Sequence, residues 1–314
     1  MIIIGTPVDE HLNPNLTTIR RVLDECRGYL RDGQVIILRS TVVPGMTEHI
    51  QRYVSSLGLR ISVGFCPERV AQGKSLEEFT TIPQIISALD GPTLSRIKAL
   101  FSPFTSEFIE LEPREAEVAK LMTNAWRYIQ FATVNQFYTL ATSENLDFER
   151  ILHACRHNYP RMSGMPAPGL TAGPCLMKDT MQLAAFSRDG FILGHAAMMV
   201  NEGLPAHLVN RAKRQTDLSS ARAGVLGMAF KAGSDDPRDS LSYKLRKILM
   251  LEARSVLSTD PYVRDSTLVP LQRVIEDSDV LFVATPHPEY RGLQIPEGKI
   301  VIDVWNVVGE RASL

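Results

Sequence analysis

Residues 222–260 read RAGVLGMAFKAGSDDPRDSLSYKLRKILMLEARSVLSTD and decide the fold class of the last third of the chain. The runs GVLGMAF and SVLSTD have the short apolar character of strands, and an amphipathic stretch from Ser240 to Leu251 lies between them. Strand, helix and strand in this order predict a βαβ unit. Two later runs, DVLFVAT and KIVIDVW, extend the series, so we expect a Rossmann-like α/β domain over residues 214–314.

The first third of the chain shows the same alternation. Short apolar runs occur at Ile2 to Ile4, Val35 to Leu38, Ile61 to Val63, Ile85 to Ser87 and Phe108 to Leu111. Amphipathic stretches begin at about Leu16 and Met46. Residues 1–112 therefore predict part of a parallel, Rossmann-like sheet with covering helices, so that the whole chain is of the α/β class.

The middle of the chain is predicted to be helical. Glu115 to Leu146 contains no glycine or proline and has apolar residues at helical spacing, which indicates one long helix. Shorter helices are expected from Asp147 to His157 and from Leu193 to Lys213, with a Pro/Gly-rich loop between them. The polar segment 211–222 is typical of a hinge. The expected domains are residues 1–112, 113–213 and 214–314.

Composition excludes several classes of protein. The 314 residues carry a formal net charge of −1 with no block of like charge, which argues against a nucleic-acid or anionic-membrane surface. Four cysteines, Cys26, Cys66, Cys155 and Cys175, lack paired spacing, which favours a reducing compartment. The apolar run in MIIIGTP is too short for a signal peptide. We therefore expect a cytoplasmic protein.

One sequence motif of dinucleotide-binding folds is missing. Such folds open with a strand, a G-x-G-x-x-G turn and a helix, because only glycine lets the backbone approach the pyrophosphate. No two glycines of this chain are two positions apart, and the three-residue spacing of Gly224 and Gly227 is weak evidence on its own.

Cys175 is the residue best placed for nucleophilic chemistry. It lies in a loop with Pro168, Gly169, Gly173 and Pro174, and Lys178 and Asp179 follow it. A thiol on a tight turn near a lysine and a helix N-terminus can have a lowered pKa. On these residues alone, the alternative of a small buried hydrophobic cysteine stays open.

Other polar residues occur at suggestive positions. Lys120 and Asn124 are four apart on the long predicted helix and share a face, although a solvated helix flank explains them as well. Thr41 and Glu68 each follow a predicted strand, where open α/β sheets bind ligands or where turns need caps. The remaining candidates are His153 and His157, better explained structurally than as zinc ligands, and the loop residues Lys231, Asp235, Asp236 and Arg238, which suit either a phosphate site or a salt-bridged turn.

Taken in order, these segments resemble the UDP-glucose/GDP-mannose dehydrogenase family over nearly the whole chain. The motifs that carry the resemblance are IIIGTPVDE, RSTVVPGMTE, CPERVAQG, EAEVAKLMTNAWR, YPRM, PAPGLTAGPCLMKDT, GMAFKAGSDDPRDS and TDPYV. The resemblance implies an NAD-binding domain, a helical dimer-forming middle and a UDP-sugar-binding domain. It also implies NAD as cofactor, a UDP-sugar substrate, and a homodimer or higher homo-oligomer.

The resemblance assigns roles to residues. Cys175 would capture the C6 aldehyde of the sugar, Lys120 and Asn124 would stabilise the oxyanion, Asp179 and Thr41 would move protons or orient water, and Glu68 would assist hydrolysis. Substrate contacts are implied for Arg69, Arg161, Gly173, Lys231 and Arg238, and cofactor contacts for Thr6, Pro7, Thr41 and Lys178. No metal ligand is implied.

The resemblance favours one substrate class over another. PERV, YPR, the G-P-C form of the cysteine loop and NEGLP look closer to dehydrogenases of UDP-N-acetylhexosamines, whereas KDTMQL looks closer to UDP-glucose enzymes. Family members carry two further βα units before IIIGTP, and a second glycine where this chain has Ala172. These departures favour, as a third alternative, a catalytically silent protein that binds nucleotide sugar, and we expect little NAD-dependent turnover from these 314 residues alone.

Overall fold

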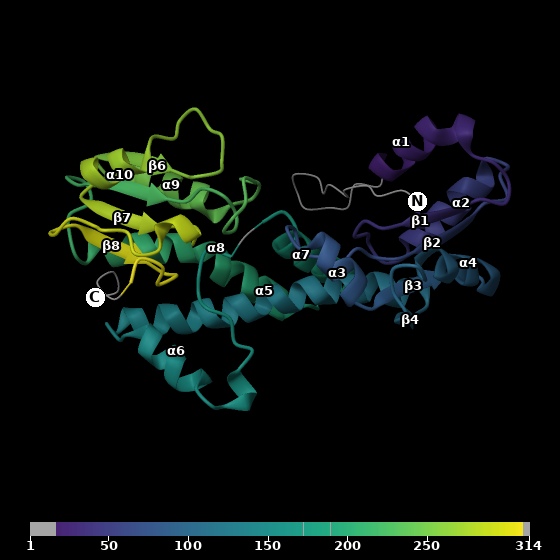
Figure 1. Cartoon of the computed structure of the whole chain (residues 1–314), viewed down its shortest axis with the longest axis horizontal. Helices are drawn as coiled ribbons and strands as arrows, with labels where there is room; N and C mark the ends of the chain where they lie inside the picture. The colour runs from purple at the N-terminus through teal and green to yellow at the C-terminus, as the bar shows by residue number, and fades with distance from the viewer. Residues whose placement is uncertain (1–16, 172, 189, 310–314) are drawn as a thin grey trace. The chain divides into compact units, whose positions relative to one another are not determined.

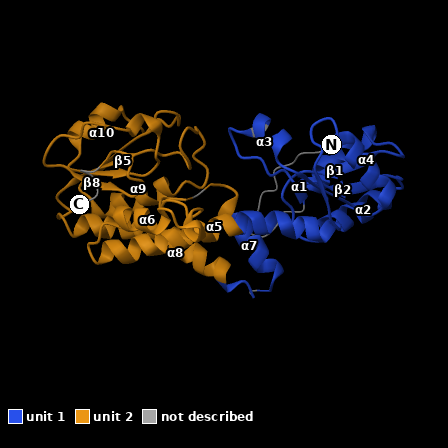
Figure 2. Ribbon diagram, turned by 60° about the horizontal axis from the view of Figure 1, so that its bottom comes forward, with its two compact units in different colours: residues 1–125, 178–192 blue, residues 126–177, 193–314 orange. Residues whose placement is uncertain are grey.

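The computed structural model describes residues 17–171, 173–188 and 190–309, which form two compact units (Figure 2). Unit 1 comprises residues 1–125 and 178–192, and unit 2 comprises residues 126–177 and 193–314. The long helix α5 (Pro113–Ser143) and the helix α7 (Leu176–Phe186) each contribute residues to both units. The strand predicted at Ile2 to Ile4, and the residues Thr6, Pro7 and Ala172, lie outside the described residues.

Unit 1 is built on a four-stranded sheet of order β1-β2-β3-β4 (Figure 1). Its strands are β1 (Val35–Leu38), β2 (Ser62–Phe65), β3 (Gln84–Ala88) and β4 (Phe108–Glu110). Its other helices are α1 (Thr17–Cys26), η1 (Arg27–Tyr29), α2 (Met46–Ser56), α3 (Ser75–Thr81) and α4 (Gly91–Phe101). The strands lie where the apolar runs of residues 35–111 predict them.

The side chains of β1 point alternately to the two faces of this sheet, and helices cover both faces. Ile36 and Leu38 belong to the core that α1 and α2 share with the sheet, whereas Ile37 belongs to the core formed with α4. Successive side chains of a strand point to opposite faces, so one run of four apolar residues serves both cores.

The pairing of β2 with β3 is antiparallel, so the expectation of a parallel sheet throughout was wrong at this pair. Gly64 is in register with Ala88, and Phe65 with Ser87. A parallel pair needs a crossover, usually a helix packed on the sheet. The only helix in this connection is α3, of seven residues, and none of its described side chains is buried. Because α3 does not carry the chain across the sheet, the chain enters β3 at the same edge at which it left β2. The two strands therefore run antiparallel.

Unit 2 combines helices with a second four-stranded sheet, which is parallel throughout (Figure 1). Its strands are β5 (Arg222–Leu226), β6 (Ser255–Thr259), β7 (Val280–Val283) and β8 (Ile300–Asp303), in the order β6-β5-β7-β8. Its helices are α6 (Phe148–Arg156), η2 (Pro160–Met162), α8 (Ile192–Lys213), α9 (Leu241–Glu252), α10 (Leu271–Asp277) and η3 (Pro288–Tyr290), besides most of α5.

The polar segment 211–222 is not a hinge, contrary to the sequence prediction. Ala212, Leu218 and Ala221 are buried in one apolar core that also contains Tyr138 of α5 and Val225 of β5. The predicted hinge is tied down because its few apolar side chains complete this core, although its charged residues dominate the sequence pattern.

Candidate functional site

The strand order of unit 2 creates a position where open α/β sheets bind ligands. Because β5 lies between β6 and β7, the connection that leaves β5 leads towards β6 and the one that leaves β7 leads towards β8, so the two diverge at the carboxyl ends of these strands, which is a topological switch point. Gly227 directly follows β5 and has a φ of +93°, and a Cβ on it would lie only 2.5 Å from the Cβ of Thr285. The close approach of these two loops therefore requires glycine at position 227.

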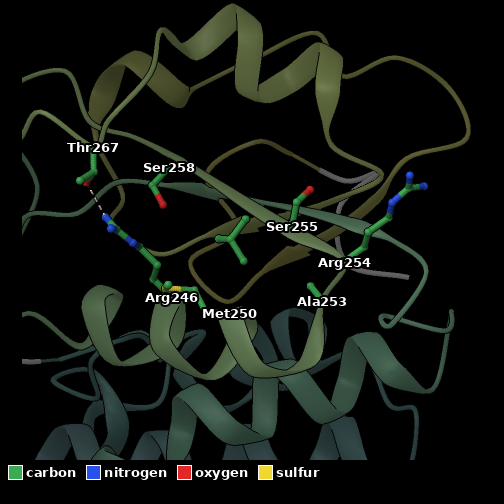
Figure 3. Close-up of a pocket in the computed structure, with 8 residues that line it drawn as sticks. Arg246, Met250, Ala253, Arg254, Ser255, Ser258 and Thr267 are labelled. Atoms are coloured by element: carbon green, nitrogen blue, oxygen red, sulfur yellow. Dashed lines mark hydrogen bonds between the residues drawn. The ribbon is translucent and has the colours of Figure 1, made fainter.

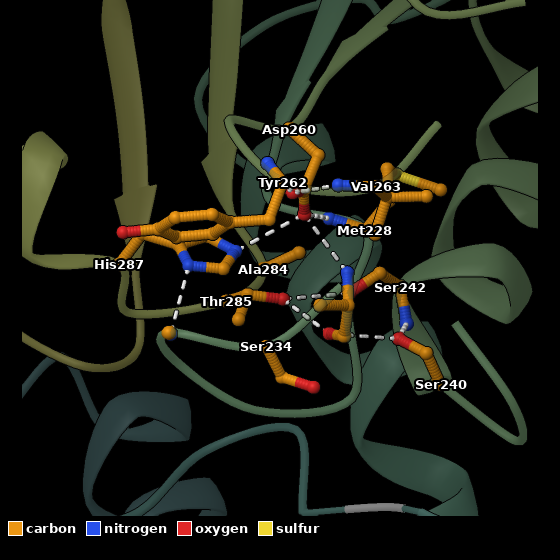
Figure 4. Close-up of polar contacts among 12 residues, drawn as sticks. Met228, Ser234, Ser240, Ser242, Asp260, Tyr262, Val263, Ala284, Thr285 and His287 are labelled. Atoms are coloured by element: carbon orange, nitrogen blue, oxygen red, sulfur yellow. Dashed lines mark hydrogen bonds and ion pairs between the residues drawn. The ribbon is translucent and has the colours of Figure 1, made fainter. Parts of the chain in front are cut away.

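The loop of residues 228–240, here called the switch loop, follows Gly227 and carries Lys231 and Arg238. Its backbone is fixed at Ala229, whose carbonyl accepts hydrogen bonds from Thr285 Oγ1 at 2.7 Å and Ser240 Oγ at 3.1 Å (Figure 4). Phe230 N also donates to the carbonyl of Asp236 across the loop, at 3.0 Å. The loop thus has a defined course rather than being a mobile connection.

The cysteine loop, described at residues 168–171 and 173–175, rests on this switch loop. Gly173 has a φ of +108°, and a Cβ on it would lie 2.6 Å from the ring of Phe230. Gly173 N points at the carbonyl of Asp239, at 3.4 Å. At the other end of the loop, a Cβ on Gly169 would lie 2.2 Å from the ring of Trp305, just after β8. Both glycines therefore let the loop approach the carboxyl edge of the sheet.

A buried asparagine holds the same loop from the helical side. Asn135 of α5 is fully buried; its Oδ1 accepts from Gly169 N at 2.8 Å, and its Nδ2 donates to Gly169 O at 3.1 Å. Its Nδ2 also donates to Asn201 Oδ1 of α8 at 2.9 Å. The cysteine loop is thus clamped between the helices and the sheet of unit 2.

Cys175 ends this loop and directly precedes α7, and it is the one exposed cysteine of the four. Cys66, by contrast, is buried, and burial raises the pKa of its thiol to about 12. Arg238 is ion-paired with Asp236 at 2.7 Å, which raises the pKa of the guanidinium; the neighbouring Cys175 adds to that rise when it is charged.

The other residues of unit 2 with implied substrate contacts are Lys231, Arg161 and Arg238, and they are more exposed than Gly173. Lys231 is half-buried, with Nζ 5.7 Å from the centre of the Phe230 ring. Arg161 is exposed and stacks on Tyr159, with its guanidinium 5.6 Å from the ring centre. Arg238 and Asp236 form the salt-bridged turn that the sequence left as one of two alternatives.

Unit 1 brings Asn124, Lys178 and Asp179 together in one polar cluster, and Lys120 lies one turn before Asn124 on α5. Lys120 and Asn124 of α5 are only 8% and 9% exposed, so they lie on a buried flank rather than a solvated one. Asn124 Nδ2 donates to Asp179 Oδ2 at 2.5 Å, and Asp179, in the first turn of α7, is fully buried. Lys178 Nζ lies 2.9 Å from Asp179 Oδ1.

Glu68 and Thr41 follow the adjacent parallel strands β2 and β1. Burial acts to raise the pKa of Glu68, but hydrogen bonds from Val70 N and the charge of Arg39 outweigh it, so the pKa is held below its usual range. Arg39, 1% exposed, forms an ion pair with Glu68 and donates to Gln84 Oε1 at 3.2 Å. Thr41 is half-buried. Arg69 donates to the carbonyl of Pro83 in the same unit.

Several buried polar residues that support these loops were missed by the sequence analysis. They include Glu117, Asn135, Asp260 and His287, as well as Arg39 and Asn201. Glu117 accepts from Thr47 N at 2.8 Å and from Gly45 N at 2.5 Å, and so satisfies amides at the N-terminus of α2. Glu117, Asp260 and His287 lay inside quoted motifs or their flanks, but no local pattern showed that they are buried.

Two other features lack the geometry of a site. A hollow of about 350 Å³ beside β6 contains two arginines, but Arg246 donates to Thr267 Oγ1 at 3.0 Å and Arg254 points away from it (Figure 3). His153 and His157 stack with ring centres 5.1 Å apart, and among the described residues no group of three or more His, Cys, Asp or Glu side chains could hold a metal ion.

Comparison with known families accounts for this arrangement. Residues 1–105 match the NAD-binding domain, residues 114–202 the central domain and residues 224–310 the UDP-binding domain of the UDP-glucose/GDP-mannose dehydrogenase family. These three domains in one chain define a nucleotide-sugar dehydrogenase, an oxidoreductase that uses NAD. The chain belongs to the UDP-glucose/GDP-mannose dehydrogenase family.

Individual relatives agree with this. The UDP-N-acetyl-D-mannosamine dehydrogenase of Pyrococcus horikoshii is 31% identical over 99% of this chain and 78% of its own length. The solved UDP-D-ManNAc dehydrogenase from the same organism superposes with a TM-score of 0.89 at 29% identity, over 98% of this chain and 78% of that one. A UDP-glucose dehydrogenase from Pyrobaculum islandicum gives a TM-score of 0.88 at 27% identity, over 99% and 77%.

The described helices were also compared with the dimensions of a lipid bilayer. None of them combines the length and the apolar character that a membrane-spanning helix requires.

Proposed function

We propose that this chain oxidises the C6 hydroxymethyl group of a UDP-N-acetylhexosamine, with UDP-N-acetylmannosamine as the favoured substrate, to the uronic acid. The observation that carries the proposal is the exposed thiol of Cys175, held at the start of α7 by a loop that packs on the switch point of the UDP-binding domain. The names of the relatives from Pyrococcus horikoshii support the choice of sugar.

The chemistry explains why a thiol is needed. Loss of a hydride and a proton converts the hydroxymethyl group to an aldehyde, and the Cys175 thiolate adds to its carbonyl carbon to give a thiohemiacetal. Loss of a second hydride and proton gives a thioester, and water then releases the carboxylate and the thiol. NAD, when bound, accepts the two hydrides, one per molecule. The start of a helix favours the thiolate form that begins this sequence.

The unit 1 cluster suits the remaining roles. We assign oxyanion stabilisation to Lys120 and Asn124, because both are buried donors, and removal of one such donor costs about 3 kcal/mol of transition-state stabilisation in other enzymes. Asp179, which accepts from Asn124, orients this amide and handles protons with Thr41. The ion pair with Arg39 keeps Glu68 ionised, as a residue that assists hydrolysis must be.

The NAD site is only partly accounted for by these residues. Thr41 lies just beyond β1, at the edge where such sheets bind nucleotides, and Lys178 can supply a positive charge. The 314 residues contain no G-x-G turn, so they do not supply the usual backbone contact to the pyrophosphate. We keep Thr6 and Pro7 as proposed cofactor contacts that lie outside the described residues.

Three further assignments are proposals of the same kind. We propose domain boundaries at residues 112 and 213, and the gaps between the family matches, at 105–114 and 202–224, support them. A homodimer or higher homo-oligomer is supported by large apolar side chains exposed on the helices of unit 2, such as Phe137, Leu140 and Met199. A cytoplasmic location is supported by the unpaired spacing of the cysteines.

The test combines binding and turnover. Calorimetry should rank UDP-N-acetylmannosamine above UDP-N-acetylglucosamine and UDP-glucose, and NADH formation at 340 nm should be measured on this chain and on one extended upstream by the two βα units of the family. Cys175→Ser should lower turnover of the active form by at least about a thousand-fold, whereas Cys155→Ser should leave it unchanged. Undetectable binding of all three sugars would refute the proposal, and a preference for UDP-glucose would replace the favoured sugar.

A further inference from the structure

We propose that the buried Asp260–His287 pair positions the switch loop, and that it thereby sets both the affinity of unit 2 for the UDP-sugar and the reactivity of Cys175. Neither residue has a role in the mechanism above. The inference rests on the proposed function, because it concerns the same site, but it assigns the pair an action through the loop rather than on the substrate.

Asp260 connects two stretches of backbone that come from adjacent strands. Its Oδ2 accepts from Met228 N at 2.6 Å and from Ala229 N at 2.9 Å, at the start of the switch loop (Figure 4). Its Oδ1 accepts from Tyr262 N at 2.8 Å and from Val263 N at 2.9 Å, in the turn that follows β6. One side chain thus fixes the spacing between the ends of β5 and β6.

His287 extends this connection to the other side of the loop. Its side chain is fully buried, and its Nδ1 lies 3.2 Å from Gly233 N. A backbone amide can only donate, so Nδ1 accepts and the ring carries its proton on Nε2. Nε2 therefore donates to Asp260 Oδ2, at 3.0 Å (Figure 4). Asp260 orients the ring, and the ring holds Gly233.

The switch loop is anchored at Ala229 by Asp260 and at Gly233 by His287, and the segment between these residues carries Phe230 and Lys231. Ala229 is held at its amide by Asp260 and at its carbonyl by Thr285 and Ser240. Phe230 and Lys231 lie between Ala229 and Gly233, so the direction of both side chains depends on the two anchors. The ring of Phe230 supports Gly173 of the cysteine loop.

The chemistry of the pair explains why these two residue types are used. Every partner of Asp260 described above is a donor, so an asparagine would have to turn its NH2 group towards other N–H groups. Burial acts to raise the pKa of Asp260, but the hydrogen bond from His287 and those from the backbone amides outweigh it and hold the pKa far below its usual range. The carboxylate thus stays ionised and accepts from both loops.

Three substitutions distinguish the anchor at Ala229, held by Asp260, from the anchor at Gly233, held by His287. Asp260→Asn weakens both. His287→Gln keeps a donor near the position of Nε2 but removes the acceptor for Gly233, whereas His287→Asn keeps that acceptor and removes the donor to Asp260. The matched control is Asp279→Asn, since Asp279 is also hydrogen-bonded to a basic residue, Arg222, but stands at the amino edge of the same sheet.

The readouts are UDP and UDP-N-acetylmannosamine affinity by calorimetry, and the rates of iodoacetamide labelling of Cys175 and Cys155 in the same molecule. Labelling of the buried Cys66 reports unfolding of unit 1, and the fluorescence of Trp126 and Trp305, which both lie in unit 2, reports unfolding of that unit. We expect Asp260→Asn to weaken UDP binding and to lower the ratio of Cys175 to Cys155 labelling, each by about ten-fold, because lost hydrogen bonds to charged groups have effects of that order. Both His287 variants should show smaller losses, and Asp279→Asn none.

The outcomes are decisive for the pair. Variants that keep Cys66 protected and retain wild-type affinity and labelling ratio would overturn the inference. If Asp260→Asn does not fold, the two His287 variants decide it in the same way. If the unmodified chain binds no UDP-sugar, the proposed function fails, but the labelling ratio still tests whether the pair controls Cys175.

Discussion

Each unit places a carboxylate just after the second strand of a βαβ segment, and the two carboxylates have different partners. Glu68 follows β2 and accepts from Arg69 N at 2.8 Å and from Val70 N at 3.0 Å in its own turn. Asp260 follows β6 and likewise accepts from two amides of its own turn. In both units, the carboxylate also reaches the end of the neighbouring strand.

The difference lies in how that neighbouring strand is reached. Glu68 is bound by the guanidinium of Arg39, a side chain that can be replaced without changing the backbone. Asp260 is bound by the amides of Met228 and Ala229, so it fixes the course of the loop itself. The comparison teaches that a carboxylate at the same position after a strand pairs with a side chain in unit 1 but holds the backbone of the next loop in unit 2.

The largest effect on stability is expected from Arg39→Met in unit 1. Breaking a buried ion pair typically costs about 3–5 kcal/mol, but the Glu68 side chain is 33% exposed, so solvent screening lowers our expectation to about 2 kcal/mol. Denaturant unfolding measures the change. Arg60→Met, which breaks the exposed pair with Asp32, should cost less than about 1 kcal/mol.

A double-mutant cycle sharpens this comparison. Glu68→Gln combined with Arg39→Met should be closer in stability to the unmodified chain than the sum of the single changes, because neither change then leaves an unpaired buried charge. Strict additivity would mean that the two side chains do not interact, and would remove the basis for calling Glu68 an ion-paired residue.

A smaller effect is expected where the cysteine loop meets the switch loop. Gly173→Ala should cost about 1 kcal/mol of unfolding free energy for its positive φ, and the clash with Phe230 should move the loop and slow Cys175 labelling. Gly292→Ala is the matched control, because Gly292 has a φ of +67° and a Cβ on it would point into open space. Equal labelling rates in the two variants would show that Phe230 does not support the loop.

The smallest effect concerns the exposed pair Asp279–Arg222. Hydrogen bonds from Arg222 lower the pKa of Asp279 to about 2. A lowered folded-state pKa stabilises the protein above the unfolded value of about 4, and this contribution is lost as the pH falls from about 4 to about 2. Asp279 is about half exposed, so Asp279→Asn should cost less than about 1 kcal/mol at pH 7, and the difference from the unmodified chain should vanish near pH 2. Unfolding measured over pH 2–7 tests this, and a difference that grows in acid would contradict it.

Much of the fold could be predicted from local patterns. The apolar runs place β1 and β5 to β8, and the stretch without glycine or proline predicts α5, because strand and helix periodicity are properties of neighbouring residues. The antiparallel entry of β3 could not be predicted, since an apolar run does not encode its direction in a sheet. The hinge prediction at 211–222 failed for a related reason: charge content hides the few apolar residues that a core can bury.

The sequence by itself determined the α/β class, the family and the identity of Cys175 as the candidate nucleophile, because these depend on periodicity and on short ordered motifs. Only the tertiary structure decided which polar residues hold the loops in place. Asp260 and His287 are 27 positions apart, and Asn135 and Gly169 are 34 apart. Their hydrogen bonds exist because packing brings distant segments together and removes water from them, and no local pattern records that burial.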